Sequence, residues 1–338
     1  LGKYSGRIRK VFDYWKENFY LYPTLRYKKS KIETKLFTNN IHLVISLSPR
    51  VLSYNIPYFI TLLDIEHLIK PYYPEVSQYG IWRDRENFYS KALKRAAKIF
   101  VGTKIGKEQI RDFYNLAPEN ILVNPFPIND FFKTENFQEL DIHKKFNLPP
   151  KFLFYPAQFW PHKNHVTLLK AISKINLKKE QKIHLVLSGS DKGNLKYIKK
   201  VINSLKIESY VHFVGFISES EILNFYKKAI ALPYVSLFGP DNLPPLEAFA
   251  MNCPVIAHKT PGSEEQLGDA AYLLDTLDEH ELENAIIKII SDQDFTDELK
   301  IKGKKKIKHL TADNYVARII ECINQFARYR STWDIDYK

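Results

Sequence analysis

The sequence predicts an α/β protein with two domains, each built on a parallel β-sheet flanked by helices. Three observations support this fold class. At 338 residues, the chain exceeds the roughly 250–300 residues that one hydrophobic core usually supports. From residue 41 onward, short apolar or β-branched runs alternate with longer helical patterns. Several of these runs are apolar throughout, as strands are when both faces of a sheet are covered.

Apolar or β-branched runs are expected to form the strands, and helical patterns separate them. The predicted strands cover residues 42–47, 58–63, 98–102, 121–125, 152–156, 184–188, 211–214, 230–233, 254–257 and 271–274. The predicted helices cover residues 84–97, 106–114, 165–173, 195–205, 218–229, 244–251 and 279–291, followed by 297–309 and 313–328. This alternation indicates parallel connections within each sheet.

A boundary between the two domains is predicted near residue 145. The segment 129–136 is polar and irregular, and Pro149 and Pro150 interrupt regular structure just before a predicted strand. We therefore expect a first domain at 41–145, a second at 146–312 and a last helical segment at 313–338. Residues 1–40 lack the opening strand and Gly-rich turn of a doubly wound domain. Either the first strands lie upstream of this sequence, or the first domain is reduced.

Composition favours a globular protein in a reduced compartment. Hydrophobic residues make up 45% of the chain, with 12 Gly and 18 Pro, as in folded proteins. No uncharged apolar run reaches about 18 residues, so no membrane-spanning helix is expected. The first 35 residues lack the apolar region of a signal peptide. Cys253 and Cys322 are too few for a disulfide framework, which favours a cytoplasmic location.

The first 40 residues carry most of the excess positive charge. They hold ten basic and three acidic residues, a net +7, whereas the whole chain carries +12. Nine aromatic residues are interleaved with them. Such a segment suits an anionic membrane surface and, less well, a nucleic acid. An ordinary helix with a solvated basic face explains it equally well. A peripheral position on the inner face of the plasma membrane is thus one of three open interpretations.

The densest group of candidate binding residues lies between residues 236 and 248. The sequence there is Ser-Leu-Phe-Gly-Pro-Asp-Asn-Leu-Pro-Pro-Leu-Glu-Ala, which predicts a loop ending in Pro-Pro at the start of a helix. A helix N-terminus attracts phosphate through its unpaired N–H groups and its dipole. Glu247, one turn into the helix, could bind two vicinal ribose hydroxyls. The alternative is a glutamate that only stabilises the helix dipole.

With the small-residue helix and the Pro-Val-Ile strand that follow it, this segment resembles the nucleotide-sugar motif of retaining family-4 glycosyltransferases. That motif has two glutamates eight positions apart, and Glu247 occupies the place of the second, which binds the ribose. Gly239 stands where the first, which contacts the transferred sugar, is expected. The resemblance implies a variant Phe-Gly-Pro-x-Asn loop in which donor contacts come from Gly239, Pro240, Asn242 and Leu243, with Asp241 as a candidate catalytic replacement for the missing carboxylate.

A second segment, residues 154–165, is similar to the strand, turn and helix start that carry Gly-Arg and then Lys in this family. There the two cations neutralise the donor diphosphate. Lys163 matches the lysine, whereas Ala157 and Gln158 replace the glycine and the arginine. A leaving diphosphate gains negative charge, so a cation stabilises the transition state more than the ground state. We expect Lys163, aided by His162, to be the catalytic cation; the alternative is a surface lysine at a helix start.

Shorter segments resemble other elements of the family in the expected order. Gly189 ends a strand near the diphosphate, and Phe216 follows the segment that faces the base. In the first domain, Asp64 follows a strand similar to the family's Thr-x-His-Asp segment, with Leu63 in place of the histidine. Asp64 is therefore a candidate for sugar or acceptor contact and for catalysis. His67 is a candidate on the same side, although such a histidine more often caps or supports its neighbours.

The resemblance covers about residues 41–330 and implies the GT-B fold, in which two Rossmann-like domains face a cleft and the last helix crosses back to the first domain. It implies retention of anomeric configuration, no required metal and no cofactor, with a nucleotide-diphosphate sugar as donor. The expected enzyme is a hexosyltransferase of cell-surface glycan synthesis that acts on a saccharide or lipid-linked acceptor. Because the first glutamate and the arginine are absent, a catalytically weak or inactive scaffold in a glycan-assembly complex is the alternative.

Other motif classes are missing from the sequence. It contains no G-x-G-x-x-G after a strand, no G-x-x-x-x-G-K-[ST] and no G-x-S-x-G. Its ten histidines and two cysteines show no zinc-ligand spacing. These observations disfavour a dinucleotide dehydrogenase, a P-loop ATPase, an α/β-hydrolase and a zinc protein.

Overall fold

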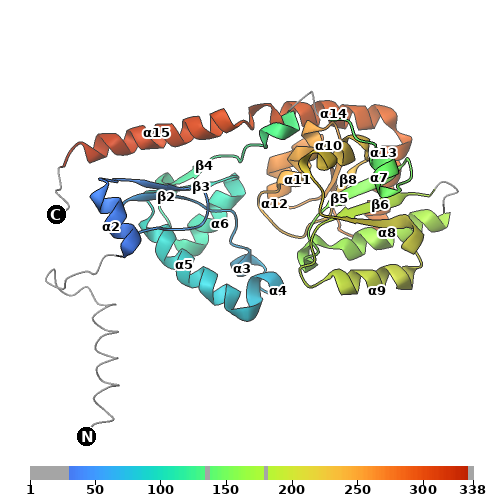
Figure 1. The fold of residues 1–338 in the computed structure, drawn as a ribbon, viewed down its shortest axis with the longest axis horizontal. Helices are drawn as coiled ribbons and strands as arrows, with labels where there is room; N and C mark the ends of the chain where they lie inside the picture. Colours follow the sequence, from blue (N-terminus) through green and yellow to red (C-terminus); the bar gives the residue numbers. More distant parts are fainter. Residues whose placement is uncertain (1–29, 134–137, 179–181, 334–338) are drawn as a thin grey trace, which may run out of the picture.

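The computed structural model describes residues 30–133, 138–178 and 182–333. It consists of two α/β domains side by side, and the last helix runs from the second domain along the first (Figure 1). All ten predicted strands form, most within two residues of the predicted ends. The basic segment at residues 1–29 lies outside the described residues, so its predicted membrane contact is not addressed by the fold.

The first domain is a four-stranded parallel sheet whose strands lie in sequence order. They are β1 (Val44–Ser46), β2 (Tyr58–Thr61), β3 (Lys98–Val101) and β4 (Ile121–Val123). The connecting helices are α3 (Glu66–Ile69), α4 (Pro74–Ser77), α5 (Ile81–Arg95) and α6 (Lys104–Tyr114), and α2 (Lys31–Thr38) precedes the sheet. Among the described strands, the order contains no reversal.

The two faces of this first sheet are covered by different parts of the chain. Side chains of β2 and β3 alternate between the faces, as the pleat requires. Tyr58 and Ile60 pack with α5 and α6. Phe59 packs with Phe100 and with residues of α15 (Ala312–Arg330), including Ile319. The last helix therefore crosses back onto the first sheet, as Figure 1 shows.

The second domain contains six parallel strands in two hydrogen-bonded groups. They are β5 (Phe152–Pro156), β6 (His184–Ser188), β7 (Val211–Gly215), β8 (Leu232–Tyr234), β9 (Val255–His258) and β10 (Tyr272–Leu274). The groups meet at β5 and β8, where Ile230 N–H donates to the Phe152 carbonyl at 2.9 Å and Phe154 N–H to the Ala231 carbonyl at 3.1 Å. The spatial order is therefore β7-β6-β5-β8-β9-β10, and the direction of strand addition reverses between β5 and β8.

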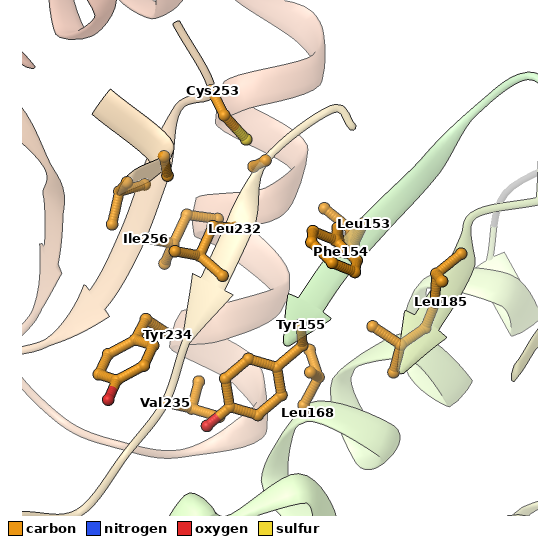
Figure 2. Close-up of a cluster of buried hydrophobic side chains, with 14 of the residues drawn as sticks. Leu153, Phe154, Tyr155, Leu168, Leu185, Leu232, Tyr234, Val235, Cys253 and Ile256 are labelled. Carbon is orange, nitrogen blue, oxygen red and sulfur yellow. The ribbon is translucent and has the colours of Figure 1, made fainter. Parts of the chain in front are cut away.

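Such a reversal creates a crevice at the carboxyl ends of the two central strands, where open α/β sheets bind their ligands. A large hydrophobic core lies behind it, and Figure 2 shows Leu153, Phe154 and Leu232 within it. The surrounding helices are α7 (Ile142–Phe146), α8 (His165–Lys178), α9 (Leu195–Leu205), α10 (Glu219–Lys228), α11 (Leu243–Ala250), α12 (Pro261–Leu267), α13 (Glu279–Ser291) and α14 (Gln293–Lys306).

The boundary between the two domains lies earlier in the chain than the predicted position near residue 145. Ile128, Phe132 and Ile142 are buried in the core of the second domain. The polar residues at 129–136 suggested a linker, but in the described part of this segment Phe131 and Phe132 pack against the core of the second domain. The structure therefore places the boundary between β4 and Ile128.

No helix in the described ranges is both long enough and apolar enough to cross a membrane.

Candidate functional site

Lys163 lies at the carboxyl end of β5, in the short 3-10 turn Pro161–Lys163 that leads into α8. Two tyrosines fix it. Tyr155 donates its hydroxyl to the Lys163 carbonyl at 2.7 Å, and the Lys163 ammonium donates to the Tyr234 hydroxyl at 3.0 Å. Figure 2 shows both tyrosines toward the carboxyl ends of β5 and β8, with their rings in the buried core. The two central strands thus position the backbone and the charge of one lysine.

The environment of the Lys163 ammonium is polar but uncompensated. Its second contact is the Ser236 hydroxyl at 3.4 Å. No carboxylate in the described ranges forms an ion pair with it. A cation that is held only by neutral hydroxyls at a crevice attracts an anionic ligand.

A chain of hydrogen bonds connects Lys163 to the start of α11. The Tyr234 hydroxyl donates to Oδ1 of Asn242 at 2.5 Å, and the Asn242 side-chain amide donates to the Gly239 carbonyl at 3.1 Å. Asn242 is the N-cap residue of α11. The structure therefore brings Lys163, Gly239 and the α11 N-terminus into one connected group.

The N-terminus of α11 has fewer backbone donors than the sequence suggested. The helix begins at Leu243, so Pro244 and Pro245 occupy its second and third positions instead of its first. Proline has no N–H, and the Asn242 N–H already donates to Oε1 of Gln266 at 3.0 Å. The expectation of an amide-rich helix start is corrected accordingly. An anion at this end would interact with the helix dipole, the Leu243 N–H and the Lys163 charge.

Glu247 lies on the inner side of α11 and is partly buried. The Tyr226 hydroxyl donates to its Oε2 at 3.0 Å, and burial raises the pKa of the Glu247 carboxyl. One oxygen is therefore engaged within the domain. For the other oxygen, Oε1, the hydrogen bonds among the described residues include no partner, and vicinal hydroxyls of a ligand are suitable donors to it.

The turns after β5 and β6 meet beside this group. Gly189 has a φ of 153°, and a Cβ at this position would lie 2.4 Å from the Ala157 carbonyl oxygen. The glycine is required by this close approach. Gln158 is exposed and accepts a hydrogen bond from the Trp160 indole at 2.9 Å. Phe216, after β7, is 99% exposed, which leaves its ring available for stacking.

Of the remaining loop residues, Pro240 is buried and Leu243 is 41% exposed. A Cβ at position 262 would lie only 2.6 Å from the Pro240 carbonyl oxygen, so a glycine is needed at this position. Gly239 has a φ of 113°, a conformation that favours glycine.

His162 connects the two domains. Its backbone N–H donates to Oε1 of Glu75 at 3.0 Å, and its ring Nδ1 contacts the same oxygen. The ring stacks on Phe238 with centroids 3.9 Å apart. Burial lowers the pKa of His162, so the ring is neutral near pH 7. His162 therefore supports the loop and the domain contact beside Lys163 without adding a second full positive charge.

The first domain reaches the 237–239 loop through α3. Glu66 accepts the Gly239 N–H at 3.0 Å, and Lys70 donates to the Leu237 carbonyl. Asp64 organises this helix, because its Oδ1 accepts the Glu66 N–H at 2.9 Å and an Arg85 N–H at 2.5 Å. Asp64 thus lies near the cleft, engaged with its own domain.

His67, which the sequence suggested as a candidate for sugar or acceptor contact, has surroundings that differ from those expected. His67 is 0% exposed and packs in the interior of the first domain, with Nε2 3.3 Å from Oε2 of Glu86. Its ring faces Trp82 and Tyr89, so its position supports packing and not sugar contact.

Asp241 points toward the first domain. Its carboxylate accepts the Gly102 N–H, and a Cβ at Gly102 would lie 2.3 Å from Oδ2. Burial, reinforced by Glu265, raises the pKa of Asp241 to about 7. With Glu265 and Lys306 it lines a separate pocket of about 120 Å³. The structure therefore does not bring Asp241 together with Lys163, because the loop turns its side chain away.

Sequence reasoning missed four residues that organise the site: Tyr155, Tyr234, Glu66 and Glu75. The tyrosines could have been suspected, since each places a hydroxyl at the end of an otherwise apolar strand pattern. The glutamates follow β2 at the carboxyl edge of the first sheet, but nothing in the local sequence shows that they reach residues 162 and 239. No group of three or more His, Cys, Asp or Glu residues that could hold a metal occurs in the described ranges.

Comparison with known proteins places these features in context. The alpha-monoglucosyldiacylglycerol synthase of Streptococcus pneumoniae is 30% identical over 190 residues, covering 56% of this chain and 42% of that protein. The O-antigen chain mannosyltransferase RfbU of Salmonella typhimurium is 28% identical over 227 residues, covering 66% and 59%. The chain thus spans about half the length of these relatives.

Solved structures resemble the whole arrangement of domains. Sucrose-phosphate synthase from Thermosynechococcus elongatus superposes with a TM-score of 0.71 at 18% identity, over 88% of this chain and 77% of that one. Anabaena HepE in complex with UDP-glucose gives 0.70 at 17% identity, over 86% and 81%. The fold is GT-B, as predicted.

The family assignment follows from the second domain. Residues 136–306, about half of the chain, match the family described as "Glycosyl transferases group 1". The matched range contains Lys163 and Gly189, which follow β5 and β6, and Glu247, which lies in α11 after β8. The chain belongs to the group 1 glycosyl transferases.

Proposed function

We propose that this chain transfers a hexose, with retention of configuration and without a metal ion, from a nucleotide-diphosphate sugar to a saccharide or lipid-linked acceptor. The observation that carries the proposal is the Lys163 ammonium, held at the strand-order reversal by two hydroxyls and by no carboxylate of the described residues. A diphosphate is the ligand whose charge matches this position.

The chemistry asked of Lys163 is electrostatic. As the bond between the sugar and the diphosphate breaks, negative charge develops on the diphosphate, and a fixed ammonium lowers the energy of that state. Tyr155 and Tyr234 hold the lysine in place before the ligand arrives, so little reorganisation is needed. The acceptor hydroxyl attacks from the face that the diphosphate leaves, which gives retention.

The nucleoside has matching contacts on the second domain. Glu247 keeps one oxygen for the two ribose hydroxyls while Tyr226 occupies the other. The exposed ring of Phe216 suits stacking on the base or on its edge. Phe216 follows β7 and Glu247 lies in the helix after β8, so both come after the carboxyl ends of strands in the sheet whose strand β5 precedes Lys163.

The acceptor is proposed to be a glycolipid or a growing surface saccharide. Support comes from the relatives, whose names describe a glucosyldiacylglycerol synthase and an O-antigen mannosyltransferase. We propose that the chain works on the inner face of the plasma membrane, where residues 1–40 provide the basic contact.

Donor binding is tested first by thermal denaturation with UDP, GDP, ADP and their glucose or mannose conjugates. We expect one base to raise the melting temperature, and the corresponding nucleoside without phosphate to have little effect. The ribose contact is tested with the 2′,3′-dideoxy form of that diphosphate. The wild type should lose about tenfold in affinity for the dideoxy form, whereas Glu247→Ala should bind both forms alike, because the acceptor oxygens are then already lost.

Turnover distinguishes the enzyme from the scaffold. With a binding donor and a diacylglycerol or mannose-terminated acceptor, release of nucleoside diphosphate is measured, and the product anomer is read by NMR. Retention supports the proposal, and inversion overturns the proposed stereochemistry. A chain that binds nucleotide sugars but releases no diphosphate with any acceptor is the inactive scaffold. If none of the nucleotides raises the melting temperature, the proposal of a donor site is wrong.

A further inference from the structure

A glutamate of the first domain is positioned on the donor-side loop of the second. Glu66 lies in the first turn of α3, and its Oε1 accepts the Gly239 N–H at 3.0 Å. Lys70, at the end of the same helix, donates to the carbonyl of Leu237. One short helix therefore contacts the 237–239 loop at two points.

The other oxygen of Glu66 is without a partner. The residue is 3% exposed, and its Oε2 has no hydrogen-bond partner among the described residues. A buried carboxylate oxygen without a donor is costly, and such groups in native structures usually have a partner. Burial accordingly raises the pKa of Glu66 to about 7. The position favours a ligand that brings a hydroxyl group.

Near the contact between Glu66 and the 237–239 loop, two more buried polar atoms lack a hydrogen-bond partner among the described residues. Oε2 of Glu75 and Nδ1 of His258 have no hydrogen-bond partner in the part of the chain that the structure describes. Glu75 is held through its other oxygen by His162, next to Lys163. His258 lines the same small pocket as Tyr234 and Gly239. A hexose carries several hydroxyls, each both donor and acceptor, and so matches a group of unpaired polar atoms.

We propose that Glu66 binds the transferred sugar of the donor, with Oε2 accepting hydrogen bonds from hexose hydroxyls while Oε1 remains on Gly239. The inference rests on the proposed function, because it takes Lys163 as the partner of the diphosphate. A chain of hydrogen bonds connects Glu66 to Lys163 through Gly239, Asn242 and Tyr234. A sugar bound by Glu66 and a diphosphate bound by Lys163 would therefore be neighbours.

The loop itself cannot supply this carboxylate at position 239. Gly239 has no side chain, its φ of 113° disfavours any other residue, and the adjacent Asp241 is turned onto Gly102. The carboxylate therefore comes from the opposite domain. Because Oε2 is buried in this closed arrangement, the donor enters when the contacts of Glu66 and Lys70 open, and closure then brings Glu66 onto the sugar.

The deciding variant is Glu66→Gln. Its amide oxygen can still accept the Gly239 N–H, so the domain contact is kept, while an NH₂ group replaces the free carboxylate oxygen. Affinity is measured by calorimetry for UDP, UDP-glucose, GDP and GDP-mannose, together with kcat/KM for the donor that the wild type uses. We expect affinity for the free diphosphate to change less than about twofold, and kcat/KM for the sugar nucleotide to fall about 10- to 100-fold.

Two further variants separate sugar binding from domain closure. Lys70→Met removes the second bridge to the loop without touching a carboxylate, and it should affect diphosphate and sugar nucleotide alike. Glu66→Asp keeps the charge but shortens the reach, so it should recover part of the turnover lost in Glu66→Gln. If the glutamine variant does not fold, Glu66→Asp tests the sugar contact in its place.

The outcomes distinguish this inference from the function on which it rests. If Glu66→Gln keeps wild-type kcat/KM, or if Lys70→Met shows the same loss confined to sugar nucleotides, Glu66 is only a clamp and the inference is wrong. In that case, wild-type binding of UDP or GDP still supports the donor site. If the wild type binds none of these four nucleotides, nor ADP and its sugar conjugates, the proposed function and the inference both fail.

Discussion

The two domains touch through two sets of contacts that are built differently. In the first, here termed the loop seam, Glu66, Lys70 and Glu75 contact residues 162 and 237–239. In the second, the helix seam, Asp241 accepts the Gly102 N–H, and Glu265 accepts the first two N–H groups of α6, at 2.7 and 3.0 Å. Both seams use carboxylates on backbone amides, yet among the described residues only the loop seam has fully buried carboxylate oxygens without a hydrogen-bond partner.

The difference indicates which seam serves the ligand. Both oxygens of Glu265 have partners, and they satisfy a helix end that would otherwise be unpaired. In the loop seam, one oxygen each of Glu66 and Glu75 is buried without a partner among the described residues. A contact that the protein satisfies by itself is structural, whereas one that it leaves incomplete, next to an uncompensated lysine, is suited to a ligand.

The largest effect is expected beside the loop seam. Lys163→Ala should lower kcat/KM for the donor by about 10²- to 10³-fold, because a preorganised charge at the leaving group is lost. Steady-state release of nucleoside diphosphate measures it. Lys170→Ala, which changes an exposed lysine of the following helix α8, is the matched control and should change the rate less than twofold. If Lys163→Ala also changes kcat/KM less than twofold, as the control does, Lys163 is an ordinary surface lysine.

A smaller effect is expected for Asp241→Asn in the helix seam. The folded-state pKa of Asp241 is raised to about 7 from 3.8, so the folded protein holds a proton that the unfolded chain releases. The stability that this proton provides is complete below about pH 4 and is lost as pH rises through about 7. The free energy of unfolding of the wild type, relative to Asp241→Asn, should therefore fall by about 1–3 kcal/mol between pH 4.5 and 8.

Urea denaturation at several pH values measures this difference, and the asparagine can keep the Gly102 hydrogen bond. A pH-independent difference would contradict the raised pKa. Turnover of the same variant also tests the catalytic role suggested by the sequence, because a loss of tenfold or more would assign Asp241 to the donor side.

The smallest effect is expected for Glu265→Ala. Loss of the side chain that caps two amides of α6 should lower the free energy of unfolding by about 1 kcal/mol. Glu264→Ala is the control, since Glu264 is exposed and forms only a 3.6 Å ion pair with Lys259, which should contribute less than about 0.5 kcal/mol. A loss of diphosphate affinity in Glu265→Ala, without destabilisation, would mean that the helix seam also serves the ligand.

Much of the fold was accessible from local patterns. Strands β5 and β6 and helices α9 and α13 have the predicted ends, because apolar periodicity and capping are encoded within a few residues. Lys163 and Glu247 could be singled out as candidates because each follows a strand or lies near the start of a helix in a recognisable order. The domain boundary was misplaced because polar residues at 129–136 conceal Ile128 and Phe132, whose burial depends on a distant core.

The sequence by itself determined the alternation of strands and helices, the family and the lysine at the end of β5, since these depend on spacing and residue type along the chain. Only the tertiary structure decided that Asp241 faces the first domain, that His67 is buried, and that Glu66 reaches Gly239 across 173 residues of sequence. Such contacts depend on how two separate cores dock, and no local pattern of charge or hydrophobicity specifies that geometry.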